Sequence, residues 1–177
     1  MNTTEQFRIR TLYRYNILDT PPDGSFDKMT QLAAKTFNVP IAIISLVDTD
    51  RIWFKSKYGL DINQITRDPG LCASAIMTND IYIVEDARKD PRTLTNPLVA
   101  GDFGLQFYAA APLHTSSGYN LGTFCIIDKQ KRYFNSEQQE MLKLFSEMVM
   151  ESIELRLNAH NILNEMLSKA EVNNIST

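Results

Sequence analysis

The spacing of hydrophobic residues changes along the chain and predicts helices at the start and strands in the middle. Residues 7–17 carry apolar side chains among polar ones and predict a short helix. Two prolines and a glycine in residues 19–24 end it, because proline cannot continue a helix. Apolar residues then recur at helical spacing over 26–37, which predicts a second helix with Ser25 as its cap.

The middle of the chain predicts an antiparallel sheet. Ile41–Val47 is apolar at both odd and even positions, as in a central strand that is covered on two faces. Ile52–Ser56 follows after a polar turn at residues 48–50, so the two segments predict a hairpin. Three further segments are strand-like, and the last two form a second predicted hairpin: Ile81–Glu85, Phe107–Leu113 and Leu121–Asp128.

The segments between the strands predict loops and one short helix. Residues 65–70 are interpreted as a loop, and Leu71–Met77 as a short helix of small residues. Residues 90–104 form a long connection that contains prolines and glycines. Loops of this length inside a compact domain often bind ligands.

The last helix is long and has a continuous apolar stripe. Ser136 and Gln139 have the spacing of a capping box, which starts the helix at Ser136. The stripe follows a 3-4 spacing that is typical of coiled-coil pairing, through Met141, Phe145, Met148, Leu155, Ile162 and Met166. The first half is also expected to cover the sheet, whereas the half beyond Arg156 has no domain left to cover.

These elements predict an α+β fold with a PAS-like antiparallel sheet of five to six strands, flanked by helices and followed by the long terminal helix. We expect one domain with its N-terminal helix over residues 1–157, and a helical extension and tail over residues 158–177.

Composition narrows the classes of function. The chain has 177 residues, of which 44% are hydrophobic and 22% charged, as in an ordinary soluble domain. The net charge of -3, with scattered Lys and Arg, argues against a nucleic-acid partner. No apolar run approaches the roughly 20 residues that span a bilayer, and no signal peptide precedes the domain, so we expect a cytoplasmic protein without a membrane partner.

Residues that could carry chemistry are few. The phosphate-binding, dinucleotide-binding, zinc-protease and hydrolase motifs are absent from the sequence. His114 and His160 are the only histidines, and both are interpreted as surface residues. A structural zinc site needs about four Cys or His ligands at tight spacing, which this sequence does not supply. We therefore expect no catalytic residues and no metal, and the sequence names no cofactor.

The two cysteines are interpreted differently. Cys72 lies near the start of the short helix, where backbone amides and the helix dipole favour a thiolate, and small neighbours leave room for a ligand. The alternative is a buried, inert thiol. Cys125 lies within a strand among apolar residues and is expected to pack in the core. Two free thiols suit a reducing compartment.

A binding pocket is predicted from topology. The first and last helices are amphipathic and are expected to cover one face of the sheet. Only the Cys72 helix and the loop of residues 90–104 then remain for the other face, and such a cover packs incompletely. The residues expected to line the resulting cavity are Trp53, Cys72, Ser74, Asp86 and Tyr108. Helix amides near Cys72 would favour an anionic or carbonyl-bearing ligand.

Many short motifs occur in one fixed order over Leu12 to Leu157. They include Leu18-Asp19-Thr20-Pro21-Pro22, Val39-Pro40-Ile41-Ala42, Arg51-Ile52-Trp53-Phe54-Lys55-Ser56, Cys72-Ala73, Asp90-Pro91-Arg92, Asn96-Pro97-Leu98-Val99, Ala111-Pro112-Leu113 and Leu121-Gly122-Thr123. In this order they resemble the GAF domains at the front of bacterial sensor histidine kinases and diguanylate cyclases.

The resemblance implies a PAS-like α+β fold, homodimerisation through terminal helices and a small-molecule pocket between the sheet and the loop side. It does not name a ligand. Bilin-binding relatives usually carry Cys-His where this chain has Cys72-Ala73, and the cyclic-nucleotide signature is missing. The cysteines do not reproduce the set of the free methionine sulfoxide reductases, and Ser74 stands where a histidine is frequent.

Three functions remain open. The first is a small-molecule-sensing or regulatory module of bacterial signal transduction, non-catalytic, whose signal leaves through the terminal helices. Its partners would be a second copy, an unknown small molecule, and an output domain or kinase of the two-component type. The second is a dimerisation or protein-interaction module with a vestigial pocket. The third is a thiol-based redox enzyme that uses Cys72.

Overall fold

The computed structural model describes residues 3–175. The elements in chain order are α1 (Thr3–Arg14), α2 (Gly24–Thr36), β1 (Ile41–Val47), β2 (Arg51–Tyr58), β3 (Gln64–Thr66), α3 (Leu71–Ala75), β4 (Tyr82–Val84), α4 (Pro97–Ala100), β5 (Phe107–His114), β6 (Asn120–Asp128) and α5 (Ser136–Ile175).

One six-stranded antiparallel sheet organises the domain, in the order β3-β2-β1-β6-β5-β4. The two predicted hairpins, β1–β2 and β5–β6, are confirmed and meet at the sheet centre, where β1 pairs with β6. The predicted α+β class, strand number and long terminal helix are therefore confirmed. The sequence prediction of a loop at residues 65–70 missed β3, a three-residue edge strand.

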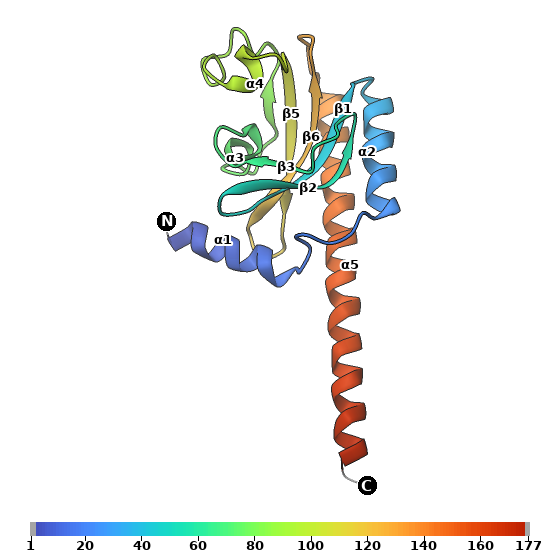
Figure 1. The fold of residues 1–177 in the computed structure, drawn as a ribbon. Coiled ribbons are helices and arrows are strands. Elements are labelled where there is room, and N and C mark those ends of the chain that lie inside the picture. The colour runs from blue at the N-terminus through green and yellow to red at the C-terminus, as the bar shows by residue number, and fades with distance from the viewer. Residues whose placement is uncertain (1–2, 176–177) are drawn as a thin grey trace.

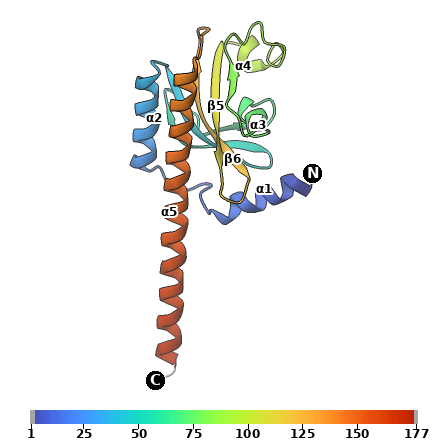
Figure 2. The same ribbon diagram turned by 180° about the vertical axis from the view of Figure 1, so that it is seen from behind.

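Helices cover the two faces of the sheet unequally. Long helices α2 and α5 lie side by side on one face, whereas the other face carries only α3, α4 and the loops around them (Figures 1 and 2). Each face has its own buried apolar cluster. The sparse cover predicted for the second face is thus confirmed.

The first helix does not cover the sheet face as expected. Helix α1 lies across one end of the sheet (Figure 1), and α2 takes its place beside α5. Arg8 holds α1 there by donating to the carbonyl oxygen of Val47 at 2.8 Å, and Leu12 is fully buried. The polar anchor, in addition to the apolar one, directs α1 to the strand ends, where carbonyl groups are free to accept.

The capping residues of α2 and α5 each come earlier in the chain than predicted. Asp23, not Ser25, caps α2 and accepts from the Ser25 amide at 2.9 Å. A capping box does start α5, but it joins Asn135 and Gln138: the Asn135 side chain accepts from the Gln138 amide at 2.9 Å, and the Gln138 side chain accepts from the Asn135 amide at 3.0 Å. In both cases an Asp or Asn, which caps helices as well as Ser does, precedes the predicted serine.

Helix α5 belongs to the core at its start and leaves the domain at its end. Leu142 and Val149 are fully buried, whereas Leu155, Ile162 and Met166 are more than half exposed. The helix runs on past α1 without a break (Figure 1), so the predicted boundary at residues 157 and 158 falls inside it. Residues 176–177 of the predicted tail lie outside the described residues. Within residues 3–175, no helix is both long and apolar enough to cross a membrane.

Candidate functional site

A cluster of hydroxyl and thiol groups lies beneath α3, in the middle of the sparsely covered face. The central strands supply Ser45, Thr123, Cys125 and Tyr108, and α3 supplies Cys72. The Ser45 and Thr123 hydroxyls are 2.9 Å apart, and the Tyr108 hydroxyl donates to the Cys72 sulfur at 3.2 Å. All five side chains are buried, so their polar atoms depend on one another for partners.

The cluster separates the acidities of its two thiols. A hydrogen bond from Cys125 lowers the pKa of Cys72, with further hydrogen bonds from Ser45, Tyr108 and Thr123, and together they outweigh the opposite effect of burial. The same contact with Cys72, together with burial, raises the pKa of Cys125 well above its ordinary value. Burial likewise raises the pKa of Tyr108. The arrangement favours a thiolate at Cys72 surrounded by protonated donors.

A small cleft leads to this cluster. Its volume is about 80 Å³. It is lined by Ile43, Phe54, Leu60, Ile62, Ile65, Leu71, Cys72, Leu98, Phe103, Leu105, Tyr108 and Ile127. The walls are apolar, and the sulfur of Cys72 and the ring of Tyr108 are the groups at which chemistry can occur.

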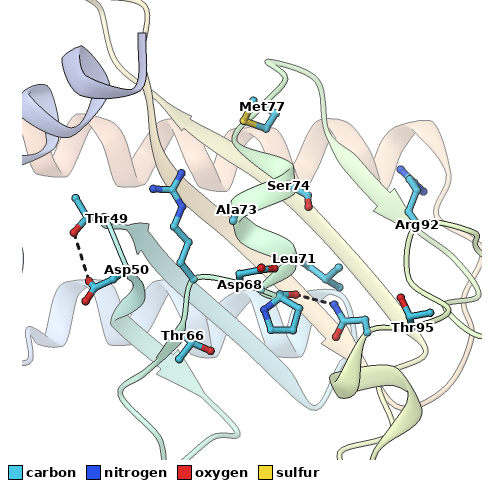
Figure 3. A pocket seen from close by; sticks show the side chains of 14 residues that line it. Thr49, Asp50, Thr66, Asp68, Leu71, Ala73, Ser74, Met77, Arg92 and Thr95 are labelled. Atoms are coloured by element: carbon cyan, nitrogen blue, oxygen red, sulfur yellow. Dashed lines mark hydrogen bonds between the residues drawn. The ribbon is translucent and has the colours of Figure 1, made fainter. Parts of the chain in front are cut away.

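A larger, open groove of about 650 Å³ lies on the outer side of α3. Figure 3 shows Thr49 and Asp50 on one side of it, Ser74 on α3, and Arg92 and Thr95 on the other side. Ser74 is exposed here. Arg92 forms an ion pair with Asp90 and lies 4.6 Å from the centre of the Tyr82 ring.

A second arginine connects this groove to α1. Arg67, in the loop between β3 and α3, donates to a Glu5 carboxylate oxygen at 2.7 Å and to the Asp48 carbonyl oxygen at 2.9 Å. Arg67 therefore both lines the groove and binds the N-terminal helix.

The structure brings together two of the five predicted pocket residues. Cys72 and Tyr108 are in contact, but Ser74 faces the outer groove instead. Trp53 belongs to the buried cluster on the opposite face, where the Lys55 ammonium lies 6.0 Å from its ring centre. Asp86 lies in the loop after β4, with the Lys89 ammonium 3.9 Å away. The single pocket drawn from the sequence is thus not formed, and ligand binding by these residues stays a prediction.

Trp53 shows why the prediction failed. Ile52, Trp53 and Phe54 are all buried, because β2 is covered on both faces, and the alternation of such a strand does not reveal which face is which. The sequence analysis singled out neither Ser45 nor Thr123, and it interpreted Cys125 as a core residue. Ser45 gave a signal, since it is the one hydroxyl-bearing residue of the otherwise apolar strand β1.

Possible metal ligands lie apart from one another in the described part of the chain. Among residues 3–175, no three His, Cys, Asp or Glu side chains gather closely enough to hold a metal ion. His114 bonds through its ring to Asn120 at 2.8 Å, and His160 lies on the exposed half of α5.

Comparison with known proteins agrees with the fold. The chain is 39% identical over 150 residues to a cyclic di-GMP phosphodiesterase of Pseudomonas aeruginosa, covering 84% of this chain but only 25% of that protein. A solved domain of a two-component sensor histidine kinase protein from Sinorhizobium meliloti superposes with a TM-score of 0.60, at 17% identity, covering 80% of this chain and 96% of that one.

An enzyme also shares the fold. The type II free methionine-R-sulfoxide reductase of Thermoplasma acidophilum superposes with a TM-score of 0.61, at 18% identity, covering 73% of this chain and 90% of that one. At this identity the likeness concerns the fold alone. The sequence profile of the GAF domain matches residues 21–153, which is most of the chain and the whole of the sheet. This chain therefore belongs to the GAF domain family.

Proposed function

We propose that this chain is a sensory or regulatory GAF module of a bacterial signalling protein, non-catalytic, whose signal leaves through α5. The observation that carries the proposal is the course of α5. One continuous helix packs on the back of the sheet and then extends beyond the domain as an exposed rod (Figure 2). A displacement of the sheet can therefore be transmitted along a rigid element.

Contacts at the start of α5 make this coupling direct. Phe145 stacks on Phe124 of β6, with ring centres 5.2 Å apart. Phe124 neighbours Thr123 and Cys125, whose side chains point to the opposite face, toward α3. A ligand that moved α3 would therefore act on the same strand that supports α5.

We propose that the exposed half of α5 pairs with a second copy of the chain. Leu155 and Ile162 are 69% and 59% exposed, seven residues apart, which places them on one stripe of the helix. Two such stripes would remove this apolar surface from water. The proposed partners are thus a second copy and an output domain or kinase, since the chain spans only a quarter of the length of the curated relative that it matches.

The proposal assigns no catalytic role to this chain. In many thiol enzymes a histidine beside the cysteine acts as its base. The cleft lining contains neither histidine nor carboxylate. The names of the phosphodiesterase relative and the reductase neighbour describe those proteins as wholes.

A second candidate function is a dimerisation module with a vestigial pocket. The size of the cleft favours it, because about 80 Å³ is far below the roughly 300–1,000 Å³ of usual ligand sites. A sensor that used this cleft would have to bind a molecule of only a few heavy atoms, or open the cleft on binding.

Native mass spectrometry of the purified chain separates the two functions. We expect a sensor to carry a non-covalent guest that is lost under denaturing conditions, and Leu98→Trp, which fills the cleft, to remove it. Leu94→Trp is the matched control, because Leu94 lies just before α4 but is 51% exposed and outside the cleft. A dimer whose mass is that of two protein chains without a guest would contradict the sensor function and support the interaction module.

A further inference from the structure

Cys72 and Cys125 meet across the interface between α3 and the sheet. Cys125 lies on central strand β6, opposite Ile43 of β1 and Ala110 of β5, and its side chain belongs to the cluster that faces α3. Cys72, in the first turn of α3, belongs to the same buried cluster, and the neighbouring Cys125 side chain lowers the pKa of Cys72. Both cysteines are free.

The two thiols are not equivalent. The Tyr108 hydroxyl donates to the Cys72 sulfur at 3.2 Å, and the donors around Cys72 stabilise its anion. The contact with Cys72 and burial raise the pKa of Cys125, so this thiol keeps its proton. A thiolate beside a protonated thiol is the arrangement in which the first can attack an oxidant and the second can then resolve the product.

Access also distinguishes them. The apolar cleft reaches Cys72, whereas Cys125 is absent from its lining and is fully buried. A cleft of about 80 Å³ with apolar walls admits a small uncharged molecule and excludes bulky or charged ones.

We propose that Cys72 and Cys125 form a redox-sensitive thiol pair that a small uncharged hydroperoxide converts to an intramolecular disulfide. The Cys72 thiolate attacks the peroxide, the O–O bond breaks, and Cys72 becomes a sulfenic acid while hydroxide leaves. The Cys125 sulfur then attacks the Cys72 sulfur, its proton joins the departing hydroxyl, and water leaves. In sum two thiols and one hydrogen peroxide give one disulfide and two waters.

Such a bond would fix α3 against β6. Helix α3 has only five residues with loops at both ends, so it can approach the sheet without disturbing another helix. Its preceding loop carries Arg67, which is bonded to Glu5 of α1. Oxidation would therefore change the position of the loop that is hydrogen-bonded to the N-terminal helix. This inference does not rest on the proposed sensing of a bound ligand.

The test is oxidation of the intact, reduced protein with hydrogen peroxide, followed by alkylation under denaturing conditions and mass spectrometry. We expect the loss of two hydrogen atoms, no alkylated cysteine, and one linked peptide pair containing Cys72 and Cys125. Disulfide-linked dimers, or two cysteines that are still alkylated while the protein remains folded, would overturn the proposal.

Variants establish the order of the steps. In Cys125→Ser we expect the reaction to stop at a Cys72 sulfenic acid, which dimedone captures when the protein is unfolded in its presence. In Cys72→Ser we expect Cys125 to stay unmodified. A wild-type sulfenic acid that persists beside a free Cys125 would contradict the pairing.

Tyr108→Phe tests the role of the hydrogen bond. We expect alkylation of Cys72 at neutral pH to slow several-fold and its pH profile to move to higher pH. Tyr82→Phe is the matched control, because its ring packs on Tyr108 with centres 6.1 Å apart but its hydroxyl is not the one that reaches Cys72. Equal pH profiles for the two variants would remove Tyr108 from the account. The mass spectrometry of a bound guest does not depend on the oxidation results, so the sensor proposal is tested separately from the thiol pair.

Discussion

Asp23 and Arg156 form an ion pair that joins the start of α2 to the point where α5 leaves the domain. Asp23 is also the N-cap of α2, and the Arg156 guanidinium lies over the Phe26 ring, 4.8 Å from its centre. The hydrogen bonds from Arg156 and from the Ser25 amide lower the pKa of the Asp23 carboxyl. Close by, the Tyr15 hydroxyl donates to Glu154 at 3.2 Å. Two polar contacts thus hold α5 at its exit.

Substitutions at Asp23 separate its two roles. Asp23→Asn keeps a capping oxygen but loses the charge, and we expect it to lower the free energy of unfolding by about 0.5 kcal/mol, as for a partly exposed pair. Asp23→Ala also loses the cap and should cost about 1 kcal/mol more. Urea denaturation measures both. Equal losses for the two variants would show that the cap contributes nothing.

Acid is expected to weaken the attachment of α1. Partial burial opposes ionisation of Glu5, but hydrogen bonds from Arg8 and Arg67 outweigh it and lower the pKa of Glu5 below the ordinary value of 4.5. The folded state therefore binds this proton more weakly than the unfolded state. The stabilisation is fully present above the ordinary pKa and is lost as the pH falls through the lower, folded pKa.

Glu5→Gln tests this assignment. We expect it to cost roughly 1–2 kcal/mol at neutral pH, and to make stability less dependent on pH between neutrality and acid. Urea denaturation over a pH series, with hydrogen exchange of residues 3–14, gives the comparison. If wild type and Glu5→Gln lose stability equally on acidification, Glu5 does not hold α1.

The centre of the sheet tolerates no side chain at Gly122. A Cβ there would lie 1.8 Å from the Ser45 carbonyl oxygen and 2.8 Å from the Leu46 Cα, both backbone atoms of β1. We expect Gly122→Ala to destabilise the protein by about 3 kcal/mol. Gly24→Ala is the control, because nothing lies within 4 Å of its added Cβ, and it should be neutral within about 0.5 kcal/mol. Similar unfolding midpoints for the two variants would refute the close approach of β1 and β6.

Local patterns were sufficient to predict the long helices and the strands of both hairpins, and long-range pairing was needed to predict the site. The strands of both hairpins are strongly apolar and bounded by turn residues, so their positions follow from the sequence. Strand β3 has only three residues and half-exposed or exposed side chains, so it has no such signal. It exists because β2 offers it an edge.

The thiol pair illustrates the limit for the site. Cys72 and Cys125 are 53 positions apart, and each was interpretable alone, as a helix-start thiol and as a core residue. Their proximity depends on the register between β1 and β6 and on the position of α3 over the sheet. No local sequence pattern predicts either feature. For the same reason the sequence prediction assigned Trp53 to the pocket, whereas the structure places it on the opposite face of the sheet.

Sedimentation of the full chain at tens of micromolar tests the central claim most directly, namely that α5 is the output element and pairs with a second copy. We expect a dimer that Leu155→Glu with Ile162→Glu weakens at least tenfold. The control, Asn164→Glu with Ser168→Glu, adds the same charges to the opposite side of the exposed helix and should leave the dimer intact. A wild-type monomer, or a dimer that both double variants leave unchanged, would contradict the account.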